Sequence, residues 1–331
     1  MRLSYHTLDV FTERRFGGNP LAVFPDAEPL ERQGERGDEL MQRIASELNL
    51  SETVFVLPPA ERAGEPSEAV HGSPVEAGAT SARATRRVRI FTPGGEVPFA
   101  GHPTLGTAFL LASLGYGSPA PGSQPPGGAT LLVLEEGVGL VPVTVRQDGF
   151  AQLRATQPPE LRAAPLPREE LAALLNLKPA DLDEHMEPRA ASCGLPFLIV
   201  PVRDRAALAA ARVDLALWER TLAGTWAPQL YVVSAGAAEP SRVDFRARCF
   251  VPGLSVPEDP ATGAAGAARA GYLALRSGAA SGTLRWTVEQ GVELRRPSLL
   301  YLEADLDGGA VSAVRVGGHC VPVAEATMRI A

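Results

Sequence analysis

Residues 89–98 read RIFTPGGEVP and residues 248–257 read RCFVPGLSVP, so one ten-residue cassette occurs twice in the chain. Arg, Phe, Pro, Gly, Val and Pro recur at matching positions. Each copy leads into a run of small and apolar residues, LGTAFLLASLG from residue 105 and AAGAARAGYLAL from residue 264. Repetition of this kind indicates a duplicated domain.

The duplication predicts two helices that begin at equivalent places. His102 and Asp259 each precede a proline, and proline is common in the first turn of a helix. A helix N-terminus presents unpaired backbone N–H groups and a positive dipole to an anion. We therefore expect a cleft between the two halves to bind a small carboxylate, with His102 and Asp259 on opposite sides of the ligand.

Composition limits the classes of function. A chain of 331 residues, 45% hydrophobic and 21% charged, can bury cores for about two domains. The net charge of −7 argues against a nucleic-acid partner, which needs clustered Lys and Arg. Lys178 is the single lysine, so Schiff-base catalysis and a P-loop have almost no candidate residue.

The remaining patterns favour a cytoplasmic protein that needs no metal or cofactor. The three cysteines form no CxxC pair, which fits a reducing compartment. The N-terminus alternates like a strand, and no apolar run reaches the roughly 20 residues of a membrane span. The five histidines lack the HExxH spacing of a metal site, and the glycines lack the order of a dinucleotide-binding motif.

The pattern along the chain predicts many short strands and few helices. Residues 38–49 form the first amphipathic helix, and residues 60–86, without apolar periodicity, are expected to be a mobile insertion. The domains are expected at 1–157 and 158–331, with the last residues able to return to the first, and residues 157–189 crossing between them. For each half, the sequence pattern predicts an α+β fold. In it a curled, mostly antiparallel, barrel-like sheet surrounds one helix that is rich in small residues.

Four segments in order resemble the signature stretches of one known family. They are FGGNPLAVF (16–24), LNLSETVFV (48–56), FTPGGEVPFAGHPTLG (91–106) and EDPATGAA (258–265). They resemble the PhzF-like, phenazine biosynthesis-like isomerases, which are related in fold to diaminopimelate epimerase. The resemblance implies two pseudo-symmetric domains with the active site between them, no cofactor, and a homodimer.

Glu52 resembles the general acid/base of that family. A carboxylate at a helix-to-strand junction can take a proton from one carbon and return it to another, while N–H groups stabilise the enolate-like charge. An ordinary glutamate has a pKa of about 4.3, so a base that works near neutrality needs burial to raise it. The position of Glu52 alone indicates a solvated residue at the start of a strand. The motif around it favours a catalytic role instead.

His102 and Asp259 are the expected polar partners of Glu52. His102 resembles the substrate-contacting histidine of the family, although a helix cap before Pro103 is the alternative. Asp259 before Pro260 suits an ordinary N-cap as well as a catalytic role.

The expected substrate-binding residues come from both halves. Asn19 resembles a motif position near the family's site but also suits a plain turn residue. Ala100 and Gly101 precede the expected first helix, so their N–H groups are expected to line an anion site. The expected binding residues of the second half are Thr262, Gly263 and Ala264. The family often has serine where this chain has Ala264, and this departure puts the phenazine-precursor substrate in doubt.

Two rival functions remain open. A two-thiol racemase is disfavoured because the helix starts hold no cysteine, and Cys249 is expected to be a buried apolar residue. A racemase or epimerase that combines Glu52 with a second, non-thiol base is the first rival. The second is a non-catalytic metabolite-binding protein on the same fold.

Overall fold

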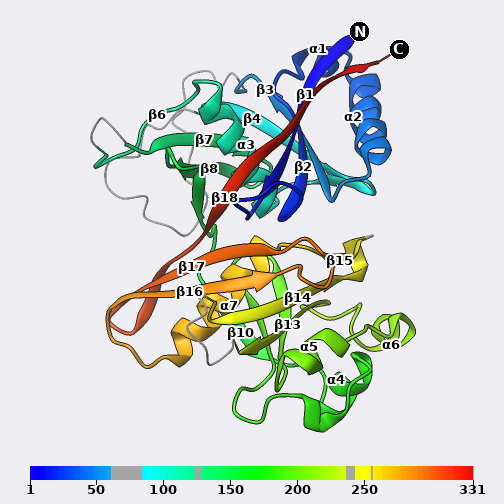
Figure 1. The fold of residues 1–331 in the computed structure, drawn as a ribbon, viewed down its shortest axis with the longest axis vertical. Coiled ribbons are helices and arrows are strands. Elements are labelled where there is room, and N and C mark those ends of the chain that lie inside the picture. The colour runs from blue at the N-terminus through cyan, green and yellow to red at the C-terminus, as the bar shows by residue number, and fades with distance from the viewer. Residues whose placement is uncertain (61–83, 124–127, 236–242, 255, 331) are drawn as a thin grey trace. The chain divides into compact units, whose positions relative to one another are not determined.

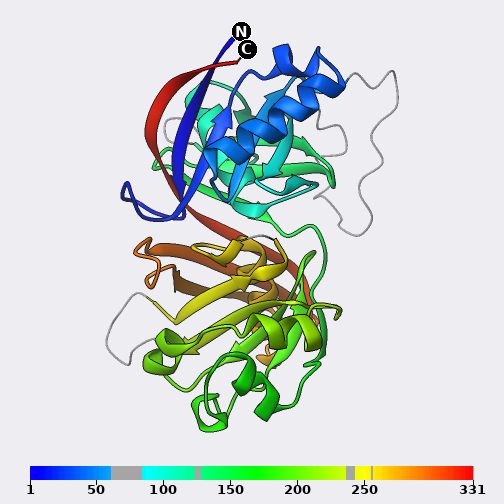
Figure 2. The ribbon, with the colours of Figure 1, turned by 90° about the vertical axis from the view of Figure 1, so that its right-hand side faces the viewer.

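The computed structural model describes residues 1–60, 84–123, 128–235, 243–254 and 256–330 (Figure 1). Two compact units divide the chain: unit 1 is Met1–Thr156 with Gly317–Ala331, and unit 2 is Gln157–Val316. The last strand, β18 (Ala310–Arg329), begins in unit 2 and ends in unit 1 beside the first strand of the chain (Figures 1 and 2).

Unit 1 closes a sheet around one helix. Its strands are β1 (Arg2–Val10), β2 (Asn19–Phe24), β3 (Glu52–Leu57), β4 (Arg86–Thr92), β5 (Gly95–Val97), β6 (Ser118–Pro119), β7 (Thr130–Glu136), β8 (Gly139–Val145) and β9 (Phe150–Arg154). Its helices are α1 (Glu28–Glu31), α2 (Glu35–Leu48) and α3 (Gly101–Ser113). The pairings run β18–β1–β2–β3–β4–β7–β8–β9 and return to β18, so the sheet forms a barrel. Only β2–β3 and β4–β7 are parallel among these printed registers.

Helix α3 lies inside this barrel and contacts β1, β2, β3, β7, β8 and β9. A Cβ at Gly106 would lie 2.6 Å from Leu21 Cδ2 and 2.7 Å from Val10 Cγ2, so the sheet approaches the helix backbone directly. Small residues along α3 therefore allow burial on every side. The amphipathic helix expected at 38–49 is α2, which ends at Asn49 in the left-handed conformation common at C-caps.

Unit 2 repeats the arrangement around α7 (Gly263–Arg276), which contacts β10, β11, β12, β16 and β17. Its strands are β10 (Glu160–Ala163), β11 (Arg189–Ser192), β12 (Pro196–Pro201), β13 (Gln229–Ala235), β14 (Phe245–Val251), β15 (Val256–Asp259), β16 (Gly282–Gln290) and β17 (Ser298–Asp307). Its other helices are α4 (Arg168–Leu174), η1 (Pro179–Asp181), α5 (Arg205–Ala210), α6 (Leu215–Thr221) and η2 (Pro252–Leu254). The expected α+β fold, a curled sheet around a central helix in each half, is confirmed.

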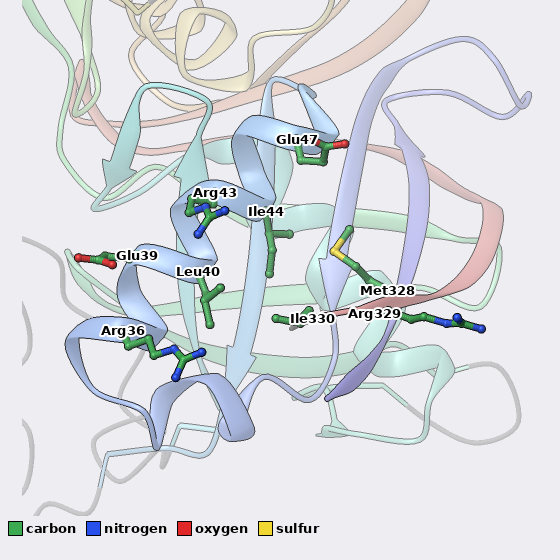
Figure 3. A pocket seen from close by; sticks show the side chains of 9 residues that line it. All are labelled: Arg36, Glu39, Leu40, Arg43, Ile44, Glu47, Met328, Arg329 and Ile330. Atoms are coloured by element: carbon green, nitrogen blue, oxygen red, sulfur yellow. The ribbon is translucent and has the colours of Figure 1, made fainter.

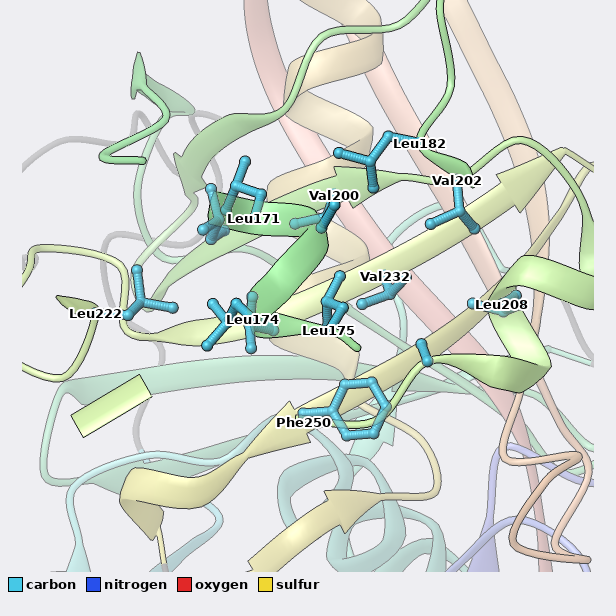
Figure 4. Packing of buried hydrophobic residues seen from close by; sticks show 14 of the residues in the cluster. Leu171, Leu174, Leu175, Leu182, Val200, Val202, Leu208, Leu222, Val232 and Phe250 are labelled. Carbon is cyan, nitrogen blue, oxygen red and sulfur yellow. The ribbon is translucent and has the colours of Figure 1, made fainter. Parts of the chain in front are cut away.

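Three short helices of unit 2 escaped the sequence analysis. The stretch 157–189, expected as a crossing segment, contains β10 and α4, and α5 and α6 follow. The N-caps Asp204 and Asp214 accept hydrogen bonds from the backbone N–H groups of Ala207 and Leu217. α4 and α5 pack leucines onto β12, β13 and β14 in a second core of this unit (Figure 4).

The first arginine of each cassette forms the same kind of paired hydrogen bond with a glutamate in its unit. Arg89 of β4 donates two hydrogen bonds to the carboxylate of Glu96, on β5. Arg248 of β14 donates two to Glu258, on β15. Paired N–H donors match the two carboxylate oxygens, so each cassette folds as a short hairpin before its helix.

Several boundaries of helices and loops differ from those that the sequence predicts. Pro103 is the third residue of α3, but Pro260 lies before α7, which begins only at Gly263. Most of the expected insertion at 60–86, residues 61–83, lies outside the described residues, and Arg86 already belongs to β4. Among the helices that the structure describes, none combines the length and apolar character needed to cross a bilayer.

Candidate active site

Three expected site residues meet in unit 1. Glu52 is the first residue of β3, where it pairs in parallel register with Leu21 of β2. Asn19 is the first residue of β2, and His102 is the second residue of α3. The parallel pair β2–β3 thus brings Asn19 and Glu52 to the same region as the start of the buried helix.

The side chains of these three residues form a short polar chain. Glu52 Oε2 lies 3.3 Å from His102 Nε2, and Asn19 Nδ2 lies 3.2 Å from His102 Nδ1. Asn19 is fully buried, His102 is 5% exposed, and the Glu52 side chain keeps 17% of its surface exposed. Of these three side chains, Glu52 is therefore the one that solvent or a ligand can reach.

The neutral imidazole of His102 has two possible proton arrangements beside Glu52. With the proton on Nε2, Nδ1 accepts from the Asn19 amide and Nε2–H faces the Glu52 carboxylate. With the proton on Nδ1, the ring donates to the Pro20 carbonyl and Nε2 faces a protonated Glu52. The second arrangement holds one proton more than the first, so Glu52 can take up a proton while the imidazole stays neutral and changes its tautomer, and a general acid/base must gain and lose one proton in this way.

His102 stays neutral at physiological pH. Burial lowers its pKa to about 3, although its hydrogen bond with the Pro20 carbonyl opposes this shift. The histidine therefore serves as a neutral hydrogen-bonding partner rather than as a cation.

The start of α3 lies next to this chain. Ala100 is the N-cap residue in an extended conformation, and Gly101 is the first helical residue. The interpretation of His102 as a helix cap is wrong, because the residue lies inside the first turn. The first N–H groups of a helix have no partner within the helix, so this end can bind an anion.

In unit 2, Asp259 belongs to a second polar cluster. Its Oδ2 accepts a hydrogen bond of 2.6 Å from Thr262 Oγ1, and its backbone carbonyl accepts one of 2.8 Å from Gln290 Nε2. The N-cap interpretation of Asp259 is wrong, because Asp259 ends β15 and Thr262 is the N-cap of α7. Gly263 and Ala264 are the first two residues of that helix.

Gln290 is a member of this cluster that the sequence analysis missed. It is fully buried at the end of β16, and its amide group also contacts the hydroxyl and the backbone N–H of Thr262. A second, shorter repeat marks it: residues 135–138 read EEGV and residues 289–292 read EQGV. This pair lies outside the two ten-residue cassettes, so their alignment does not include it.

The three cysteines are buried thiols. Burial raises the pKa of Cys193 and of Cys320 to about 12, and it raises the pKa of Cys249 well above the usual value. Cys249 lies opposite Asp259 in the β14–β15 pair, and the charge of Asp259 raises the thiol's pKa further. Because the thiolate is the reactive form, none of these cysteines suits the role of a proton-abstracting base.

A groove of about 410 Å³ lies elsewhere in unit 1, between α2 and the end of β18 (Figure 3). Leu40, Ile44, Met328 and Ile330 supply its apolar lining, and charged side chains of both elements surround them. None of its lining residues is an expected site residue, so the groove holds no part of the polar chain around His102.

Comparison with known proteins identifies the family of this chain. The family model of phenazine biosynthesis-like proteins matches residues 8–326. The chain belongs to this family. A phenazine biosynthesis-like relative from Mesorhizobium japonicum, named an uncharacterized isomerase, is 36% identical over 336 residues, with 99% of both chains covered. The trans-2,3-dihydro-3-hydroxyanthranilate isomerase of Pseudomonas aeruginosa is 35% identical over 324 residues, with 97% of both covered.

A solved structure shares the fold of this chain. The crystal structure of a PhzF-family phenazine biosynthesis protein from Bacillus anthracis matches the whole of both chains with a TM-score of 0.80 at 24% identity. The family model and the two relatives named above identify the chain as an isomerase of the phenazine biosynthesis-like family.

Proposed function

We propose that this isomerase moves a proton between carbons of a small carboxylate substrate without a cofactor, with Glu52 as the general acid/base. The observation that carries the proposal is the 3.3 Å separation between Glu52 Oε2 and His102 Nε2 at the start of a buried helix. A partly exposed carboxylate beside a buried neutral imidazole can serve as a general acid/base that a substrate can reach.

In this mechanism the Glu52 carboxylate takes a proton from a carbon of the substrate. The electrons of the broken C–H bond delocalise into the adjoining unsaturated system, and backbone N–H groups at the start of α3 stabilise the charge that develops. The protonated Glu52, whose partly exposed side chain can exchange this proton with solvent, then delivers a proton to a different carbon. The proton count is unchanged over the cycle, so no co-reactant is needed.

Further residues enter the proposal as binding groups. In unit 1, Asn19 orients His102, and the N–H groups of Ala100 and Gly101 suit a substrate carboxylate. In unit 2, we propose Asp259 as a catalytic polar partner. Its cluster supplies the proposed binding residues Thr262, Gly263 and Ala264.

The substrate class follows from the same site. A helix start selects an anionic group, and the P. aeruginosa relative is named for a substrate that carries a carboxylate. Trans-2,3-dihydro-3-hydroxyanthranilate is therefore the first compound to test. Ala264 leaves out the serine hydroxyl that the family often has, so we expect slow turnover of this compound and a different natural carboxylate.

The test is solvent-hydrogen exchange in heavy water. Wild type, Glu52→Gln and Glu325→Gln are incubated with trans-2,3-dihydro-3-hydroxyanthranilate and, in parallel, with a metabolite extract. Glu325 is exposed on β18, so its variant is the matched control. We expect deuterium to enter a ligand with wild type and the control, and this exchange to fall at least about 100-fold with Glu52→Gln.

Each result decides between the proposal and its rivals. Deuterium at a stereocentre without movement of a double bond would identify an epimerase instead. Exchange that persists undiminished in Glu52→Gln would remove Glu52 from the chemistry. A ligand that binds wild type without any exchange would favour the metabolite-binding protein.

We also propose that the protein acts as a cytoplasmic homodimer. The family resemblance suggests the dimer, and three buried cysteines suit a reducing compartment. Sedimentation equilibrium of the full chain should give twice the mass of 34.8 kDa, and a monomer at all concentrations would contradict the proposal.

A further inference from the structure

A buried carboxyl group lies beside the start of α3 and has no role in the chemistry proposed above. Glu136 is the last residue of β7 and is 7% exposed. Its Oε1 lies 2.8 Å from Thr104 Oγ1, and the same hydroxyl lies 2.8 Å from the carbonyl oxygen of Ala100. Its other oxygen, Oε2, has no hydrogen-bond partner among the residues that the structure describes.

The contacts of the Thr104 hydroxyl suit an uncharged Glu136. The Thr104 hydroxyl has one proton and two oxygen neighbours, and the Ala100 carbonyl can only accept. If the hydroxyl donates to Ala100, then Glu136 must donate to the hydroxyl and must carry a proton on Oε1. An ionised Glu136 would leave two oxygens at 2.8 Å without a proton between them, and would bury a charge with one hydrogen bond.

The second unit has the same arrangement with an amide in place of the acid. The residue before Glu136 lies opposite Arg87 of β4, and the residue before Gln290 lies opposite Arg246 of β14. Each arginine lies two residues before its cassette. Glu136 and Gln290 therefore occupy equivalent positions, at the ends of β7 and β16.

The hydrogen bonds of the two positions also correspond. Gln290 Nε2 lies 3.0 Å from Thr262 Oγ1, which donates to Asp259 Oδ2 at 2.6 Å. In both units a buried polar side chain at a strand end lies within hydrogen-bond distance of a threonine hydroxyl, which also contacts an oxygen of the segment before the helix. A glutamine cannot ionise, so the role in unit 2 requires a neutral donor.

We propose that Glu136 is a positioning residue of the active site, which holds the start of α3 as an uncharged hydrogen-bond donor equivalent to Gln290. The inference rests on the proposed function in that the held segment, Ala100 to His102, carries the groups that face the substrate. Burial raises the pKa of Glu136 to about 8 even with the Thr104 hydroxyl taken as a donor to it, which lowers the pKa, and this agrees with a neutral acid near pH 7.

The turn after Glu136 adds a second anchor to the same segment. A Cβ at Gly137 would lie 2.8 Å from the Cα and Cβ of Pro98, so the turn packs directly against the backbone that leads into Ala100. A Cβ at Gly291, after Gln290, would lie 2.6 Å from the Pro260 carbonyl oxygen. In each unit, the strand end and the helix start are fitted to each other closely.

The first test compares two substitutions of equal length. Glu136→Gln keeps a neutral donor, whereas Glu136→Met removes it. We expect Glu136→Met to lower the kcat of solvent exchange by about 10- to 100-fold, with a smaller change in KM, because His102 and the N–H groups are displaced. Glu136→Gln should restore most of that loss. Full activity of Glu136→Met, or equal loss in both variants, would overturn the proposal.

A second measurement does not depend on turnover or on how well Glu136→Met folds. With carbon-13 in the glutamate carboxyl groups, the infrared difference between wild type and Glu136→Gln at pH 7 should contain the C=O band of a carboxylic acid. A carboxylate band instead would overturn the neutral donor. If wild type exchanges no substrate, the proposed function fails, while this spectrum still decides the state of Glu136.

Discussion

Glu136→Gln should change how the stability of unit 1 depends on pH. Folded Glu136 has a pKa of about 8, raised by burial from the ordinary 4.5. The folded state therefore holds the proton more tightly than the unfolded chain, and the stability that this proton contributes is complete below about pH 4.5. As the pH rises the contribution is lost, until the folded group also ionises near pH 8. A glutamine cannot ionise and keeps its contribution throughout.

The size of the effect follows from the shift. One pKa unit corresponds to about 1.4 kcal/mol, so the shift from 4.5 to about 8 corresponds to at most about 5 kcal/mol of unfolding free energy. Of this, about 3 kcal/mol is already lost at pH 7, because the unfolded group is then fully ionised. Relative to wild type, Glu136→Gln should thus gain stability from about pH 5 upward and level off above about pH 8.

The assay must report unit 1 by itself. All three tryptophans, residues 218, 226 and 286, lie in unit 2, so fluorescence follows that unit. Hydrogen exchange of peptides from α3, followed by mass spectrometry at several pH values, gives the opening free energy of unit 1. Glu325→Gln is the control for loss of an exposed carboxylate. Parallel pH curves for wild type and Glu136→Gln would refute the reasoning.

Three other substitutions test packing, charge and substrate choice. Gly271→Ala places a Cβ 2.5 Å from Pro159 Cβ and should lower the free energy of unfolding by about 1–3 kcal/mol. Its control, Gly224→Ala, meets no atom within 4 Å and should change that free energy by less than about 0.5 kcal/mol. Urea unfolding followed by tryptophan fluorescence measures both variants. Arg248→Met leaves a buried carboxylate without its partner and should lower the free energy of unfolding by about 3–5 kcal/mol in the same assay. Arg189→Met breaks an exposed ion pair and should lower it by less than about 1 kcal/mol. Similar losses for the two variants would contradict the argument from burial. Ala264→Ser restores a hydroxyl and should raise kcat/KM for trans-2,3-dihydro-3-hydroxyanthranilate by about tenfold, the effect of one added hydrogen bond, and no gain would separate this position from substrate choice.

The repeated cassette was sufficient to predict the core of each unit. Its strands, the buried helices α3 and α7, and the amphipathic helix α2 all follow from local patterns of apolar and small residues. The short helices α4, α5 and α6 were missed, because six or seven residues contain too few turns for a periodic signal. Their capping residues, Asp204 and Asp214, were the better signal.

Hydrogen-bond partners distant in sequence were harder to foresee. Asp259 precedes a proline, as a helix cap often does, yet the helix begins four residues later because Thr262 and Gln290 hold the intervening turn. Glu136 looks like an ordinary charged residue before a glycine. Only its burial beside Thr104 distinguishes it.

The sequence by itself determined the duplicated α+β architecture, the membership of the family and the identity of Glu52 and His102 as candidates. These follow from periodicity and from motifs that are contiguous along the chain. The tertiary structure decided which polar atoms meet: Glu52 with His102, and Glu136 with Thr104 in a buried site. Proton positions depend on burial and on partners that strand pairing brings together from distant parts of the chain, and no local pattern records either.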